Sequence, residues 1–186
     1  MSRTEWAVAL LHHPVIDRRG DLVTTAVTNL DIHDIARAAR SYGAGIYYLV
    51  TPLAEQQRLV AKLLDHWLEG FGASYNPDRS EALQLVKVVP TLQAALEDFS
   101  VRCGCLATAL LTGAKGTGGL SFEQGRKLCE AQPVILTLGT GWGLAPQLFA
   151  AGWPVLEPIR CETDYNHLSV RAAAAIMFDR LFGSQQ

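Results

Sequence analysis

The sequence has little charge, no excess of basic residues and no long apolar run. Charged residues make up 18% of its 186 residues, and the formal net charge is −2. A chain with this balance does not attract nucleic acid through its overall field, so any nucleic-acid contact must use a local basic patch. The apolar run near the start, residues 6–11, is too short for a signal peptide or a membrane span. We therefore expect no membrane partner and a cytoplasmic location.

Paired-cysteine and metal-ligand motifs are also missing. None of the four cysteines belongs to a Cys-x-x-Cys pair, so all are expected to be reduced thiols, as in a cytosolic protein. The histidines have no spacing typical of a metal site, and no metal is expected. The cysteines are Cys103, Cys105, Cys129 and Cys161.

Apolar segments of strand length alternate with longer segments of helical period. This alternation predicts an α/β fold, with a mostly parallel sheet and helices on both of its faces. Hydrophobic residues make up 49% of the chain and no segment has the composition of a linker, so we expect one domain over residues 1–186. The expected strands are 6–11, 45–50, 82–89, 104–111, 133–138 and 153–159. The expected helices are 29–43, 53–70, 91–99, 121–131, 143–152 and 166–182.

Ligands of parallel sheets bind at the carboxyl ends of the strands, so the loops that follow the expected strands are the candidate binding sites. The loop "TGAKGTGG", residues 112–119, is rich in glycine but lacks the Gly-Lys-Ser/Thr of a phosphate-binding loop. We interpret it as a flexible surface loop.

The loop "LGTGWGLA", residues 138–145, directly follows an expected buried strand. Its glycines, Gly139, Gly141 and Gly143, allow a ligand to approach the backbone closely. The spacing fits a dinucleotide site with Glu157 as the ribose partner, but Ala145 replaces the third glycine of that motif. A glycine-stabilised turn without a ligand is the alternative.

The segment before the last expected helix is unusually polar. It runs from Asp164 through Asn166 and His167 to Ser169. A helix N-cap needs one such side chain, and Asn166 or Asp164 is the expected cap. The remaining polar groups are then available to a ligand, although His167 could equally be an ordinary surface residue.

Four segments together resemble a known family. They are "ALLHHPV", "VTTAVTNLDIHDIAR", "GTGWGLA" and "DYNHLSVR", and they span nearly the whole chain. They are similar to motifs of SPOUT-class RNA methyltransferases of the TrmH/SpoU branch. The resemblance is strongest to a small family of SAM-dependent RNA methyltransferases that occurs alone or fused to the bacterial tRNA guanine-N1 methyltransferase.

The resemblance implies a C-terminal trefoil knot, S-adenosylmethionine (SAM) held in it, and a homodimer. The chain departs from the TrmH/SpoU pattern at Trp142, where an acidic residue is usual in the loop, and at Asp31, where Asn is usual. The residues expected at the cofactor are Thr108, Leu138, Gly139, Thr140, Gly141, Gly143, Leu144, Glu157, Pro158, Ile159, Asn166, His167, Leu168 and Ser169.

The expected catalytic residues are Arg37, His13 and His167. Arg37 matches the arginine of the first motif, and a guanidinium, which stays protonated, suits orientation of the acceptor better than proton removal. Histidine exchanges protons near neutral pH, so His13 and His167 are candidate bases. On the dimer interpretation Arg37 acts on the site of the partner subunit. The residues expected at RNA are Arg18, Arg19, Arg40 and Arg171; ordinary solvated surface charge is the alternative.

The sequence therefore predicts a SAM-dependent RNA methyltransferase that acts on tRNA or rRNA. The loss of the acidic loop residue keeps a second hypothesis open, a SAM- and RNA-binding module without activity. The glycines after residue 138 keep a third, a dinucleotide-binding oxidoreductase.

Overall fold

The computed structural model describes residues 5–116, 118–163 and 165–184. Its main sheet has five strands in the order β5-β4-β1-β7-β6, and every pair in it is parallel. The strands are β1 (Trp6–Leu11), β4 (Ile46–Val50), β5 (Val86–Val89), β6 (Thr108–Leu111) and β7 (Val134–Gly139). The predicted α/β class with a mostly parallel sheet is confirmed, whereas the trefoil knot stays a prediction.

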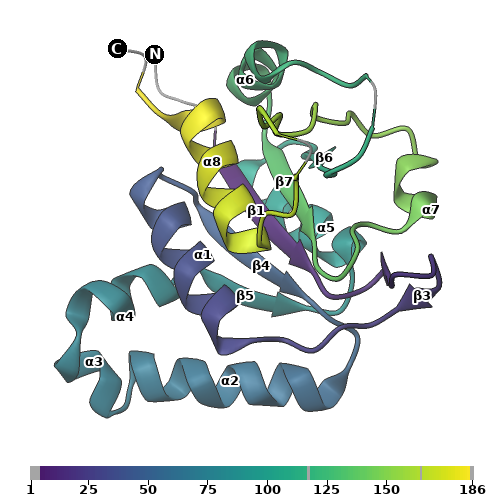
Figure 1. Ribbon diagram of the computed structural model, residues 1–186. Helices are drawn as coiled ribbons and strands as arrows, with labels where there is room; N and C mark the ends of the chain where they lie inside the picture. Colours follow the sequence, from purple (N-terminus) through teal and green to yellow (C-terminus); the bar gives the residue numbers. More distant parts are fainter. Residues whose placement is uncertain (1–4, 117, 164, 185–186) are drawn as a thin grey trace.

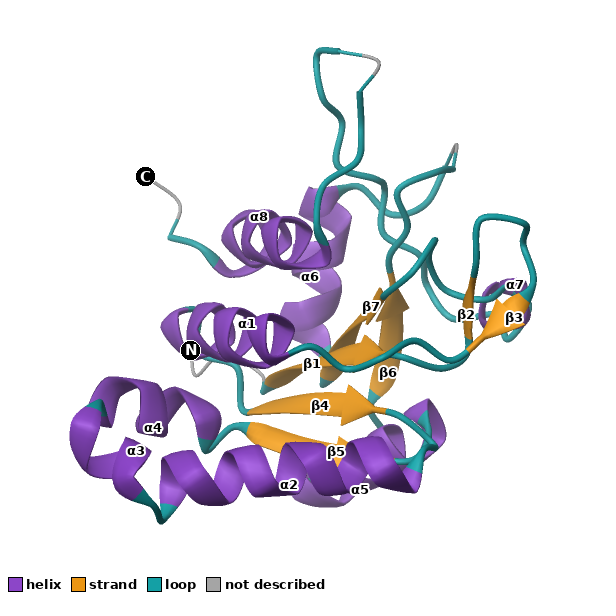
Figure 2. Cartoon of the chain, turned by 60° about the horizontal axis from the view of Figure 1, so that its bottom comes forward, coloured by secondary structure: helices purple, strands orange, loops and turns teal. Residues whose placement is uncertain are grey.

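Helices cover both faces of this sheet (Figures 1 and 2). One face carries α1 (Asn29–Ser41), α2 (Ala54–Leu68), α4 (Pro77–Leu83), α6 (Phe122–Ala131) and α8 (Val170–Phe182). The opposite face packs against α5 (Leu92–Cys103) and the region of α7 (Pro146–Phe149). The short helix α3 (Phe71–Tyr75) lies at the far corner, between α2 and α4.

The alternation of side chains along the central strand explains why both faces are apolar. In β1, Val8 and Leu10 belong to one core cluster, and Ala7 and Ala9 belong to the other. The first residue of this strand also meets the last helix, because the Trp6 ring stacks on Phe182 with 3.7 Å between centroids. Beginning and end of the fold are thus in direct contact.

Residues 153–159 do not form the predicted strand. They make only isolated parallel bridges, one of them between Val155 and Leu111. Pro154 and Pro158 lack the N–H that a ladder needs, which is why pairing stops after a few residues. Within the described part of the chain, no helix is long and apolar enough to cross a bilayer.

Other element boundaries also differ from the predictions. The helix expected over 143–152 contains only Pro146–Phe149, β6 begins at Thr108 rather than at 104, and α5 extends beyond 99 to Cys103. The helices α3 and α4 and the small hairpin of β2 (Val15–Ile16) and β3 (Leu22–Val23) were not predicted. The strand expected over 82–89 is β5 alone, because its first residues complete α4.

Candidate functional site

A pocket of about 740 Å³ opens at the carboxyl ends of β1, β6 and β7. Its size and mixed lining are typical of a small-molecule site. Four parts of the chain build it: the stretch from β2 to α1, the loops after β6 and β7, and the segment that leads into α8. The lining residues are Ile16, Thr25, Ala26, Thr28, Asp31, Thr112, Gly113, Ala114, Lys115, Leu138, Gly139, Thr140, Gly141, Trp142, Gly143, Ile159, Asn166, His167, Leu168, Ser169, Val170, Ala173 and Met177.

The glycine loop after β7 is fixed by backbone hydrogen bonds to the hairpin. The Trp142 N–H donates to the Ile16 carbonyl at 2.9 Å, and the Ile16 N–H donates to Gly143 at 3.0 Å. Gly141 has φ +60°, and a Cβ there would lie 2.9 Å from the Ile16 oxygen. This glycine is therefore required by the docking of the loop on the hairpin, and a larger side chain would disturb that contact before it reached a ligand.

A chain of hydroxyl groups runs from the pocket into the core. Thr140 donates from Oγ1 to the Leu11 carbonyl at 3.0 Å, so the 2.5 Å contact between its Oγ1 and that of Thr25 must use the proton of Thr25. Thr25 then accepts from Nδ1 of His12 at 3.0 Å. These directions assign the proton of His12 to Nδ1 and leave its buried Nε2 without a hydrogen-bond partner in the described structure.

His12 is a core residue rather than a free base. Its side chain is 0% exposed, and burial lowers its pKa to about 4, although the charge of Asp31 opposes the shift. The imidazole is neutral at physiological pH, and it supports the two threonines of the pocket wall.

The stretch from Thr25 to Val27 is held in place by α2. The Gln56 side chain accepts from the Val27 N–H at 2.5 Å and donates to the Thr25 carbonyl at 3.3 Å. The wall of the pocket is thus attached to a helix that lies outside it.

The polar side chains of the segment before α8 have different hydrogen-bonding roles. Ser169, not Asn166, is the N-cap, and its hydroxyl accepts from the Ala172 N–H, so α8 begins at Val170. Asn166 instead donates from its side chain to the Ile159 carbonyl at 3.0 Å. The alternative cap, Asp164, lies outside the described residues.

Three charged residues join α1 to α8 at the edge of the pocket. Asp31 accepts from the Thr28 hydroxyl at 2.6 Å and lies 3.5 Å from Arg171, which also reaches Asp34 at 3.3 Å. Arg171 is therefore engaged with two carboxylates, which weakens its assignment to RNA.

Most of the predicted cofactor residues gather in this pocket. Ten of them line it: Leu138, Gly139, Thr140, Gly141, Gly143, Ile159, Asn166, His167, Leu168 and Ser169.

Four predicted cofactor residues do not line the pocket. Thr108 begins β6 at the amino edge of the sheet, opposite the pocket. Leu144 is buried in the core, and Pro158 is absent from the lining. Glu157 accepts from the Phe122 N–H at 3.0 Å, so one of its carboxylate oxygens is engaged at the start of α6, away from the pocket lining.

The predicted catalytic residues are spread more widely. His167 lines the pocket, whereas His13 contacts Thr24 and the Val23 carbonyl through Nδ1 and does not line it. Arg37 is exposed on α1 and is likewise absent from the lining.

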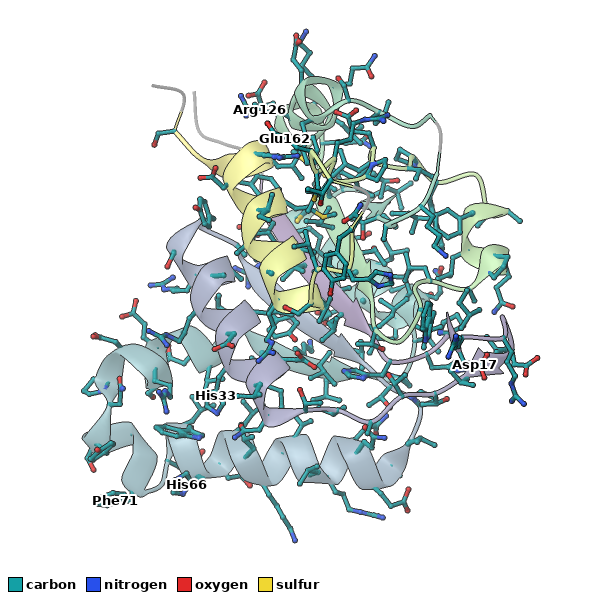
Figure 3. The ribbon with its side chains drawn as sticks, viewed as in Figure 1. Asp17, His33, His66, Phe71, Arg126 and Glu162 are labelled. Carbon is teal, nitrogen blue, oxygen red and sulfur yellow. The ribbon has the colours of Figure 1, made fainter. Side chains whose placement is uncertain are left out.

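The remaining arginines assigned to RNA lie on separate surfaces. Arg18 and Arg19 are exposed in the hairpin beside Asp17, which Figure 3 labels, and Arg19 pairs with that carboxylate and with Asp21. Arg40 pairs with Glu81 of α4.

Several lining residues were not predicted. Thr25 and Met177 reach the pocket through tertiary packing, which leaves no local pattern in the sequence. Lys115 belongs to a loop that was interpreted as bare surface, and its position after a buried strand was the available signal.

Comparisons with known proteins agree with this architecture. The tRNA (guanine-N(1)-)-methyltransferase of Oleidesulfovibrio alaskensis is 46% identical over 175 residues, which cover 94% of this chain and 41% of that protein. This chain thus spans about two fifths of the length of that relative. An uncharacterized protein of Aquifex aeolicus is 37% identical over 178 residues, 94% of this chain and 87% of its own. The crystal structure of the A. aeolicus TrmH/SpoU tRNA modifying enzyme has a TM-score of 0.56 and 15% identity, with 96% of this chain and 75% of that chain covered.

The structural similarity supports the SPOUT-type fold that the sequence motifs predicted. A family model described as SAM-dependent RNA methyltransferase matches residues 5–183, nearly the entire chain. The chain therefore belongs to the family of SAM-dependent RNA methyltransferases.

Proposed function

We propose that this chain binds SAM in the pocket at the carboxyl ends of β1, β6 and β7 and methylates a tRNA in the cytoplasm. The observation that carries the proposal is the convergence of the glycine loop after β7 and the polar segment before α8 on one cavity. The word tRNA in the names of relatives supports the choice of substrate.

The lining fits the chemistry of SAM. Leu138, Ile159 and Met177 offer apolar walls for a purine. Asn166 donates to the Ile159 carbonyl, and the second N–H of its amide offers a polar group for a ribose. When bound, SAM supplies a methyl group made electrophilic by the adjacent sulfonium.

The residues of this chain then have to orient the acceptor and remove its proton. His167 lines the pocket and is our candidate for the proton acceptor. Arg37 lies on α1 outside the pocket of its own chain, and its exposed guanidinium suits binding of RNA phosphate. We propose that the chain forms a homodimer in which Arg37 serves the pocket of the partner subunit.

Two measurements test the proposal. Calorimetry with S-adenosylhomocysteine should give saturable binding of one molecule per chain, and NAD should give none. Transfer of tritiated methyl from SAM to bulk tRNA and rRNA should label tRNA. Binding without labelling of either RNA would favour a module without activity, and NAD binding without S-adenosylhomocysteine binding would reject the proposal.

A further inference from the structure

Three aromatic rings lie close together beside the pocket, and two of them, Trp142 and His167, line it. Trp142 follows β7, whereas Tyr165 and His167 belong to the segment before α8. The ring centroids of Trp142 and His167 are 6.1 Å apart, and those of Tyr165 and His167 are 5.5 Å apart. We name these three residues the aromatic cluster.

The cluster is open to solvent although its rings are large. Trp142 is 50% exposed and Tyr165 is 72% exposed. The planes of Trp142 and His167 meet at 79°, and such an edge-to-face contact occupies only one face of one ring. Flat aromatic surface therefore remains available at the entrance.

Both loops that carry the cluster are anchored through other groups. The Trp142 N–H is bound to the Ile16 carbonyl, and the Asn166 side chain is bound to the Ile159 carbonyl. The rings are not needed for these contacts, so their position at the mouth is set by the backbone and their exposed faces are free to bind.

We propose that the aromatic cluster stacks an unpaired nucleobase of the RNA substrate beside the methyl donor. The inference rests on the proposed function, because it names what enters the same pocket. A nucleotide inside a duplex cannot bring its base or ribose to an enclosed donor, whereas an unstacked nucleotide can, and aromatic rings replace the stacking that it loses.

The charge at the mouth agrees with a nucleotide. Lys115 is the only Lys or Arg among the lining residues that the structure describes, and its side chain is exposed. An ammonium on the rim binds backbone phosphate without reading sequence, and the aromatic cluster accepts any base. Recognition of this kind selects for an unpaired strand more than for a particular nucleotide.

The cofactor and a second copy of the chain are the competing occupants. A cofactor purine has buried apolar walls deeper in the pocket at Leu138 and Ile159, where more of its surface is removed from water than at the mouth. The exposed pair Phe71 and Tyr75 provides a comparison, because it stacks on itself at a corner far from the pocket. Phe71 and Tyr75 thus offer a control surface for nonspecific stacking.

The experiment compares Trp142→Leu with Trp142→Phe, and uses Tyr75→Leu as the matched control. Affinity is measured for a short oligoadenylate, for the same strand annealed to oligouridylate, and for S-adenosylhomocysteine. Trp142→Leu should weaken binding of the single strand by about 5- to 150-fold, the loss of one stacked base, while Trp142→Phe keeps most of the affinity. Tyr75→Leu should match the wild type, and the duplex should bind weakly to all four proteins.

A spectroscopic signal accompanies the affinities. Adding oligoadenylate should quench tryptophan fluorescence in the wild type. The quenching should be missing in Trp142→Phe, because Trp142 is the tryptophan at the site. Unchanged single-strand affinity in Trp142→Leu, or equal losses for single strand and duplex, would overturn the stacking proposal. If Trp142→Leu weakens S-adenosylhomocysteine binding but leaves RNA binding intact, the ring serves the cofactor and the stacking proposal is wrong. The proposal is also wrong if a change of oligomeric state accounts for the lost RNA affinity.

The two proposals fail separately. If the wild type methylates RNA and Trp142→Leu retains full RNA affinity, the proposed function is supported and the stacking role of the aromatic cluster is rejected. If the wild type binds no S-adenosylhomocysteine but Trp142→Leu weakens single-strand binding, the stacking proposal is supported and the methyltransferase proposal is rejected.

Discussion

Acidification should destabilise this protein through His12. The imidazole is fully buried, and burial lowers its pKa from 6.5 to about 4 in the folded chain. As pH falls below 6.5, the unfolded chain takes up a proton at this position and the folded chain does not. Stability is therefore highest above pH 6.5 and is lost as pH falls toward 4.

The size of the effect follows from the two pKa values. Between about pH 7.5 and pH 5, proton uptake by the unfolded state alone should lower the free energy of unfolding by about 2 kcal/mol. The loss should approach about 3 kcal/mol near pH 4, where the folded imidazole begins to titrate. This is a large part of the stability of an ordinary domain.

The assay is urea unfolding at several pH values, for the wild type and for His12→Asn. The amide of Asn can still donate to Thr25, but it does not titrate. The quantity to compare is the change in free energy with pH, because the substitution also alters packing. Burial lowers the pKa of His33 as well, but His33 is present in both proteins and cancels in the difference. Parallel curves for the two proteins would refute the reasoning.

The remaining predictions concern the pocket and α8. Ala173→Phe enlarges a side chain that lines the cavity and should weaken S-adenosylhomocysteine binding by about 1–3 kcal/mol in calorimetry; a folded variant with wild-type affinity would mean that the cofactor binds elsewhere. Ser169→Ala removes the acceptor for the Ala172 N–H and should lower the free energy of unfolding by about 1 kcal/mol in urea titrations, with no loss if the cap is unimportant. Mixed dimers of Arg37→Ala and Ala173→Phe subunits should have one working site, although each homodimer is poorly active in methyl transfer. If verified mixed dimers stay inactive, while wild type paired with the double mutant keeps one site, Arg37 serves its own chain.

Local patterns were enough to predict the elements that build the sheet. The run 6–11 is buried along its entire length as β1, and Ser121 begins α6 with a capping box, as its position before a helical pattern indicated. The segment 153–159 misled because its apolar residues resemble a strand. Its two prolines prevent a regular strand, because each lacks an N–H group for pairing. Their effect depends on which N–H groups of the segment the neighbouring strand would have bound.

The pocket was predictable in outline because parallel strands end at one edge. Its details depend on competition between similar side chains. Asn166 and Ser169 are both good caps, and only the position of the Ile159 carbonyl decides that Asn166 is used elsewhere. Arg171 was assigned to RNA, but the packing of α8 on α1 brings it to Asp31 and Asp34. These residues are far apart in the sequence, so no local pattern predicts that they will be in contact.

The contact of Trp6 with Phe182 has a consequence for synthesis on the ribosome. The central strand β1 emerges early, but its neighbour β7 and the helix that covers Trp6 are translated much later. Until then β1 has one unpaired edge and the Trp6 ring lacks the helix that stacks on it, because this pairing must wait for the closure of a very long loop. We therefore expect the nascent chain to depend on chaperone protection, and cofactor binding to begin only once α8 has left the exit tunnel.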